Sequence, residues 1–220
     1  MNKKKFLLRI LFYSLGAFFC ANGVVLTINA NLGVSAASSL PYVLSLVTNI
    51  DVGICFMAFF VLLISAQIII LRKDFKWVNL TQIIFATMFG YFVIIAEFII
   101  GDFTLASYPG RLLILLAGNF MIALGVTMYV DVKLVPMPVE GLANALMQKI
   151  KKPFYLMKIT VDSGTALCAL IISLLAFGRI LGLREGTLIS SVMIGWMIKM
   201  IQKVLHPIME KLCFDNKENV

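Results

Sequence analysis

The residues of this sequence best suited to chemistry are a few acidic side chains embedded in long apolar runs. Asp162 is the deepest, within the apolar run 157–177, and Glu97 lies near the end of another, in FVIIAEFII. A charge at the centre of a membrane span costs roughly 3 kcal/mol on insertion scales, so each needs a physical reason. We interpret Asp162 as a group that binds a proton, a cation or a substrate amine. The alternatives are an i, i+4 pair with Lys158 for Asp162, and snorkelling to the membrane interface for Glu97.

Two segments rich in small, hydroxylated, Pro and Gly residues interrupt the apolar runs. The first is NGVVLTINANLGVSAASSLP (22–41) and the second is LVPMPVEGLANAL (134–146). Interrupted helix is tolerated in lipid only where it is buried in protein or lines a cavity. The candidate residues for a substrate site or permeation path are Asn29, Asn31, Ser35, Ser38, Ser39, Asp131, Glu140, Asn144, Asp162 and Glu97. The competing interpretation is helix capping and loop solvation, since Ser and Asn favour helix starts.

The composition places these residues in an integral membrane protein. The 220 residues are 61% hydrophobic and 14% charged, with a mean hydropathy of +0.99. Soluble domains are about 45–50% apolar and about 25% charged. The net charge of +8 invites a nucleic-acid interpretation, but no solvated face interleaves basic residues with stacking aromatics. We therefore expect a lipid bilayer, and not nucleic acid, as the environment of the chain.

Enzyme and metal chemistry find little support in the sequence. The single histidine, His206, has neither HExxH spacing nor an evident nucleophile partner, and no P-loop is present. The four cysteines and twelve methionines form no paired metal-ligand pattern, and their expected use is apolar packing. The sequence predicts a protein that is not an enzyme and that has no metal or cofactor.

The apolar runs predict six transmembrane helices, since a hydrocarbon core of roughly 30 Å requires about 20 residues. Two semi-polar segments, 33–49 and 137–150, are predicted to be extra short helices or re-entrant pieces. The basic opening and first apolar run are predicted to be an uncleaved span, and the tail 214–220 is predicted to be disordered. The predicted spans are 10–30, 52–71, 78–100, 112–132, 157–177 and 187–205.

Positive charges predict the orientation of these spans. With the N-terminus inside, 16 of the 19 Lys and Arg residues fall in cytoplasmic segments, and only Arg111, Arg179 and Arg184 fall outside. This bias predicts that both termini are cytoplasmic.

The two halves of the chain resemble each other at an offset of 102 residues. The offset pairs Arg9-Ile10-Leu11 with Arg111-Leu112-Leu113, Gly16 with Gly118, Gly23 with Gly125, and Asn29 with Asp131. Each half holds three spans, an odd number, so consecutive copies would be inverted in the membrane. We therefore predict an all-α, polytopic fold in one membrane domain (1–220), built of two inverted three-helix repeats at about 9–101 and 111–206. Interrupted segments follow the first and fourth spans.

The sequence resembles the YczE/YyaS/YitT-type bacterial membrane proteins. The features that carry this resemblance are RILFYSLGAFFCANGVVLTINANLG (9–33), its echo RLLILLAGNFMIALGVTMYVDVKL (111–134), Val161-Asp162, and GLREGTLISSVMIG (182–195). The chain departs from the family pattern at Val135, where a glycine is usual. The resemblance covers nearly the whole chain and implies a bacterial inner-membrane protein of permease type, without naming a substrate.

These observations predict a secondary transporter that moves a small solute across the bacterial cytoplasmic membrane by alternating access, since inverted repeats typically produce two such related states. Two alternatives remain open. One is an accessory or scaffold membrane protein that does not transport. The other is the substrate-binding membrane subunit of a multi-chain ATP-driven importer. The substrate, the direction of transport, the coupling ion and a homo-oligomeric state are left open by the sequence.

Overall fold

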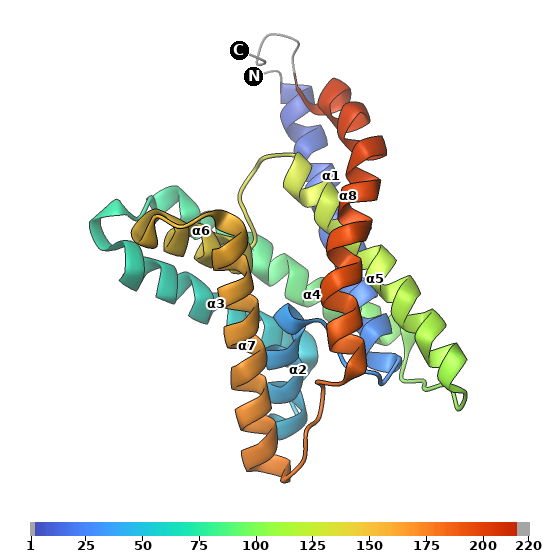
Figure 1. Cartoon of the computed structure of the whole chain (residues 1–220). Helices are drawn as coiled ribbons and strands as arrows, with labels where there is room; N and C mark the ends of the chain where they lie inside the picture. Colours follow the sequence, from blue (N-terminus) through green and yellow to red (C-terminus); the bar gives the residue numbers. More distant parts are fainter. Residues whose placement is uncertain (1–2, 215–220) are drawn as a thin grey trace.

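The computed structural model describes residues 3–214, and within that range the chain forms helices and no strands (Figure 1). Six of these helices are long and apolar enough to cross a membrane. The predicted all-α, polytopic fold is therefore confirmed. The prediction of a disordered tail, 214–220, is wrong at Phe214, whose ring packs against Arg9 and Lys133, and residues 215–220 lie outside the described part of the chain.

The long helices coincide with the predicted spans, and two short helices occupy the predicted semi-polar segments. A pair of short 3₁₀ helices, η1 (Arg72–Asp74) and η2 (Trp77–Thr81), joins the third helix to the fourth. The α-helices are α1 (Lys3–Asn29), α2 (Ala36–Thr48), α3 (Val52–Leu71), α4 (Gln82–Ile100), α5 (Tyr108–Asp131), α6 (Pro138–Ile150), α7 (Phe154–Phe177) and α8 (Glu185–Cys213).

The ends of the first and last spans differ from the prediction. α1 begins at Lys3 rather than residue 10, and α8 continues to Cys213 rather than residue 205, through Pro207. A proline inside a helix costs about 3 kcal/mol, but tertiary contacts hold the end of α8 against α1. Cys213 is 2% exposed, and Lys5 Nζ donates a hydrogen bond to the Phe214 carbonyl at 2.6 Å. The two helix ends lie side by side in Figure 1.

The same backbone features recur in the two halves, 102 residues apart. α2 and α6 each have 13 residues, and they begin at Ala36 and Pro138. The turns before them contain a left-handed residue at equivalent positions, Asn31 (φ 51°) and Lys133 (φ 49°). The residues that end them, Asn49 (φ 56°) and Lys151 (φ 57°), are equivalent as well. The internal similarity seen in the sequence therefore extends to the course of the backbone.

α1 and α5 form the central pair of the fold and cross at four glycines. A Cβ on Gly16 would lie 2.7 Å from the carbonyl oxygen of Gly125, and a Cβ on Gly23 would lie 2.6 Å from that of Gly118. Small residues let helix backbones approach closely. The pairing is reciprocal, because Gly16 is equivalent to Gly118 and Gly23 to Gly125. It also makes α1 and α5 antiparallel, so the breaks that follow them lie at opposite ends of the pair.

The other helices pack around this pair in matching combinations. α4 packs on α1, and its counterpart α8 packs on α5. The short helices α2 and α6 each pack on both α3 and α7. α3 also packs closely on α4, where the backbones of Gly53 and Gly90 meet. The equivalent residues of α7 and α8 are Tyr155 and Val192, which are 63% and 73% exposed. α7 and α8 do not close on each other in this way, and they diverge in Figure 1.

Candidate functional site

The turn between α1 and α2 is held in place by the connection between α7 and α8. The Val34 N–H donates to the Gly182 carbonyl at 3.0 Å, and the Gly186 N–H donates to the Leu32 carbonyl at 2.8 Å. Gly33 has φ +101°, and its backbone is packed against Arg184, so no side chain fits there. Ser35 then caps α2 by accepting a hydrogen bond from the Ser38 N–H. These contacts fix where α2 begins.

The turn between α5 and α6 is anchored by different groups at the other end of the central pair. The Arg9 guanidinium donates to the carbonyls of Val132 and Lys133, at 2.8 and 2.7 Å. These carbonyls directly follow the C-terminal end of α5, where a cation is favourable. Pro138 opens α6, where its missing N–H costs nothing.

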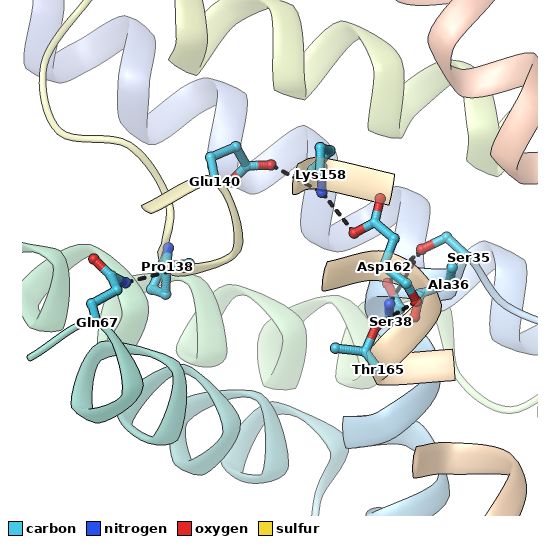
Figure 2. Close-up of polar contacts among 9 residues, drawn as sticks. All are labelled: Ser35, Ala36, Ser38, Gln67, Pro138, Glu140, Lys158, Asp162 and Thr165. Carbon is cyan, nitrogen blue, oxygen red and sulfur yellow. Dashed lines mark hydrogen bonds and ion pairs between the residues drawn. The ribbon is translucent and has the colours of Figure 1, made fainter. Parts of the chain in front are cut away.

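The first residue of each short helix is also held from the opposite half of the chain. The Pro138 carbonyl accepts a hydrogen bond from Gln67 Nε2 of α3 at 3.2 Å, and the Ala36 carbonyl accepts one from Thr165 Oγ1 of α7 at 3.1 Å (Figure 2). Because Ala36 and Pro138 are equivalent positions, the two starts are positioned by corresponding helices. The predicted interruptions are confirmed as two separate short helices with fixed N-terminal ends.

Both N-terminal ends line one cavity of about 780 Å³. Residues Ser35–Ser38 reach it from α2, and Met137, Val139 and Glu140 reach it from α6. Its walls include residues from all eight α-helices, and along the antiparallel α1–α5 pair it extends from Val24 to Val126, another equivalent pair. Ligand pockets in proteins typically measure about 300–1,000 Å³, so this cavity is large enough for a small molecule.

The charged side chains of the described residues that line this cavity are Glu140, Lys158 and Asp162. Lys158 lies between the two carboxylates, with Nζ 2.9 Å from Asp162 Oδ1 and 3.6 Å from Glu140 Oε1 (Figure 2). The pair predicted within α7 is therefore present, and Glu140 of α6 extends it to a cluster of three. The second carboxylate oxygen of Glu140 is buried and has no hydrogen-bond partner. The cluster has a formal charge of −1.

An aromatic wall completes the cavity. Phe56 and Phe60 of α3 and Phe89 of α4 line it, with ring centroids 5.4 to 5.7 Å apart. The equivalent positions of the second half are Lys158, Asp162 and Ser191, which line the same cavity. Thus the two halves contribute matching positions with opposite chemistry, apolar rings from one and charged or hydroxyl groups from the other.

The structure brings four of the sequence-predicted residues together at the cavity and places the other six elsewhere. Those at the cavity are Ser35, Ser38, Glu140 and Asp162. Ser39 is buried, with its hydroxyl donating to the Ala36 carbonyl. Asn144 lines a separate polar cavity of about 330 Å³ beside α6. Glu97 lies in the last turn of α4, away from the cavity.

The remaining three predicted residues hold the ends of the central helices. Asn29 donates to the Gly101 carbonyl at 2.8 Å, linking α1 to the end of α4. Its equivalent, Asp131, accepts from Gln202 at 2.9 Å and lies 3.3 Å from His206, linking α5 to α8. The carbonyl of Asn31 accepts from Arg184.

Sequence reasoning did not count Lys158, Ser190 or the three phenylalanines among the site residues. Lys158 is a charge inside a predicted span, and this signal was available, although it was interpreted only as a partner of Asp162. Ser190 is fully buried, lines the cavity and has a hydroxyl without a partner. Apolar rings in apolar spans give no signal until the fold places them around a cavity.

Comparisons with known proteins connect the chain to one family. No curated protein and no solved structure matches it. A family model does match residues 7–203, which include the cavity and nearly all of both halves. The chain therefore belongs to DUF6198, a family of unknown function.

Proposed function

We propose that this protein is a permease that binds a small solute in the 780 Å³ cavity and moves it across the bacterial cytoplasmic membrane. The observation that carries the proposal is the arrangement of α2 and α6, whose N-terminal ends reach this one cavity from opposite ends of the α1–α5 pair. Interrupted helices with ends that face a midplane cavity are a recurring device of secondary transporters.

The second support is the internal similarity between residues 9–101 and 111–206, which we interpret as an inverted repeat. The reciprocal contacts Gly16–Gly125 and Gly23–Gly118 are those of a two-fold axis between α1 and α5. The matching starts of α2 and α6 agree with the same axis. Because the two halves share one course of the backbone, each can adopt the conformation of the other, and this exchange gives two states open to opposite sides. Between α7 and α8 the cavity is lined by the exposed side chains of Tyr155, Ile159 and Leu188. At the equivalent place α3 and α4 meet at Gly53 and Gly90, and we take this difference to mark the half that is open in this state.

The orientation proposed from charge is compatible with the folded chain. Lys5, Arg9 and Lys133 lie at the end of the bundle where α1 begins and α8 ends. Arg184 lies at the other end, beside the turn after α1. We place the first of these ends in the cytoplasm by the excess of positive charge. The resemblance to the YczE/YyaS/YitT-type proteins supports a bacterial cytoplasmic membrane.

Ligand binding is the first test of this proposal. Purified protein is heated with pools of metabolites, and a ligand that binds only the folded state raises its unfolding free energy by about 2.7 kcal/mol at a hundredfold excess over Kd. Each hit is then offered to liposomes that contain this chain alone. Uptake driven by a solute or ion gradient supports the permease. Uptake only when an ATPase and a coupling subunit co-purify would favour the importer subunit instead.

A further inference from the structure

We propose that the ligand of the 780 Å³ cavity is an amphiphilic organic amine with a single positive charge, which enters from the bilayer between α7 and α8. This inference rests on the proposed function for its transport but concerns binding, which can be tested separately. Three features of the cavity carry it: the charge of its polar cluster, its aromatic wall and the position of its mouth.

The polar cluster lacks one positive charge. Lys158 neutralises one of the two carboxylates, Glu140 and Asp162, and the other remains without a counter-charge among the described lining residues. Burying an unpaired charge is costly, so a cationic ligand that completes the cluster gains more than a neutral one. The side chains of Glu140 and Asp162 are 20% and 29% exposed, so a ligand can reach them from the cavity, and Glu140 Oε2 accepts no hydrogen bond from the described residues. A carboxylate accepts only, so the ligand must donate, and an ammonium offers three donors.

The N-terminal ends of α2 and α6 do not reverse this preference. Each helix end contributes a partial positive charge of roughly one half. In α6, that partial charge acts on Glu140 itself, which belongs to the first turn. In α2, Ser35 already accepts the hydrogen bond of the Ser38 N–H, and the two hydroxyls lie 2.9 Å apart. The helix ends therefore stabilise the cluster, while the full charges decide the sign of the ligand.

The aromatic wall suits the same class of ligand. Phe56, Phe60 and Phe89 present an apolar surface, and the faces of aromatic rings attract cations by about 0.5–2 kcal/mol. Ser190 adds a buried hydroxyl without a partner on the α8 side of the cavity. A ligand with an ammonium group and an apolar body would contact both the charged cluster and the aromatic wall of the cavity.

The mouth of the cavity opens towards the surface of the predicted spans. Tyr155 and Ile159 of α7 and Leu188 of α8 line the cavity and are also among the exposed apolar residues. If α7 and α8 cross the bilayer, these side chains face lipid tails. A molecule that partitions into the bilayer can reach the cavity by this route, whereas a strongly hydrated one cannot. The position of the mouth therefore favours a ligand with an apolar body, as the aromatic wall does.

The test compares ligands that share an apolar body and differ in the charge of the head group. Phenylhexylamine, phenylhexanol and phenylhexanoate are titrated into the wild-type protein in nanodiscs, and affinity is measured by thermal shift and calorimetry. The amine should bind at least tenfold more tightly than the alcohol, and the acid should bind least. Methylamine, which lacks an apolar body, should bind far more weakly than phenylhexylamine. Equal binding of the alcohol, or tighter binding of the acid, would overturn the proposal. So would tighter binding of phenylalanine than of phenethylamine, since these differ only by a carboxylate.

Variants test whether the charge of the Glu140–Lys158–Asp162 cluster is what binds the amine. Glu140→Gln should weaken amine binding at least tenfold, whereas Glu185→Gln, which alters an exposed carboxylate outside the cavity, should not. The double variant Glu140→Gln/Lys158→Gln restores the formal charge of −1 and should recover amine binding, because the ligand ammonium replaces that of Lys158 beside Asp162. Unchanged binding in Glu140→Gln would contradict the assignment. If that variant does not fold, the ligand series on the wild-type protein still decides the ligand class.

Binding and transport can fail independently. Amine binding without uptake into liposomes would retain this ligand class and contradict the permease. Uptake of an anionic or neutral solute, with no amine binding, would retain the permease and contradict this ligand class.

Discussion

Phe60 of α3 and Asp162 of α7 occupy equivalent positions, 102 residues apart, and line the same cavity. The cavity thus has an aromatic side from the first half of the chain and a charged side from the second. This asymmetry matches the proposed ligand, which is itself apolar at one end and charged at the other.

The aromatic side can be tested at Phe60. Phe60→Leu keeps an apolar side chain but removes the ring, so amine affinity should fall about threefold to thirtyfold, equivalent to a cation–π energy of about 0.7–2 kcal/mol. Phe98→Leu is the matched control, because Phe98 is 90% exposed and lies outside the cavity. Calorimetric titration of both variants checks the difference. Equal affinities in the two would argue against an aromatic contribution.

The α1–α5 crossing should tolerate no side chain at its glycines. A Cβ on Gly125 would collide with the carbonyl oxygen of Gly16 and the backbone of Cys20, so Gly125→Ala should destabilise the fold by about 1–3 kcal/mol. Gly164→Ala is the control, because nothing lies within 4 Å of its Cβ position and alanine favours helix. Thermal unfolding in detergent, followed by size-exclusion chromatography, compares the two. A Gly125→Ala protein as stable as the wild type would contradict the close approach of the α1 and α5 backbones.

The hydrogen bond that anchors α2 should contribute measurable stability. Thr165 Oγ1 lies 3.1 Å from the Ala36 carbonyl and 2.8 Å from that of Asp162. Thr165→Val keeps the shape but removes the hydroxyl, which should cost about 0.5–1.5 kcal/mol. Thr160→Val is the matched control, since the exposed Thr160 hydroxyl donates within its own helix, to the Leu156 carbonyl. Denaturant unfolding that gives the same loss for both would contradict the anchoring role.

The sequence predicted the helices and their breaks because each follows from local physics. Runs of about 20 apolar residues specify long helices, and the Pro, Gly and Ser residues around 31–41 and 134–141 specify the two interruptions. The end of α8 could not be predicted from the sequence, because Pro207 favours a stop. The helix continues past Pro207 where its end packs against α1, with Lys5 bound to the Phe214 carbonyl.

The candidate site was predictable only in part for a similar reason. Asp162 stands out as a charge in an apolar run, and Lys158 lies one turn before it in the same helix. The contact of Lys158 with Glu140 joins α6 to α7 and depends on where α6 begins. That start is fixed by Gln67 and Arg9, which are far away in the sequence. The aromatic wall depends wholly on tertiary packing.

The proposed orientation predicts which connections are accessible from outside the cell. A cysteine replaces Asp74, Leu105 or Ile180, all exposed, one at a time in a Cys168→Ala background, in which the native cysteines Cys20, Cys55 and Cys213 are buried. A membrane-impermeant maleimide applied to intact cells should label residues 105 and 180, and should label residue 74 only after lysis. Labelling of residue 74 in intact cells would contradict the proposed orientation and indicate the opposite one.

Uptake by Asp162→Asn tests the central claim most directly. The ligand that binds the wild-type protein most tightly is supplied to liposomes containing the wild type, Asp162→Asn, or Asp102→Asn as a control in the exposed α4–α5 connection. We predict accumulation with the wild type and with Asp102→Asn, and none with a folded Asp162→Asn protein. Wild-type rates in Asp162→Asn, or no uptake by the wild type of any ligand that the cavity binds, would contradict the account.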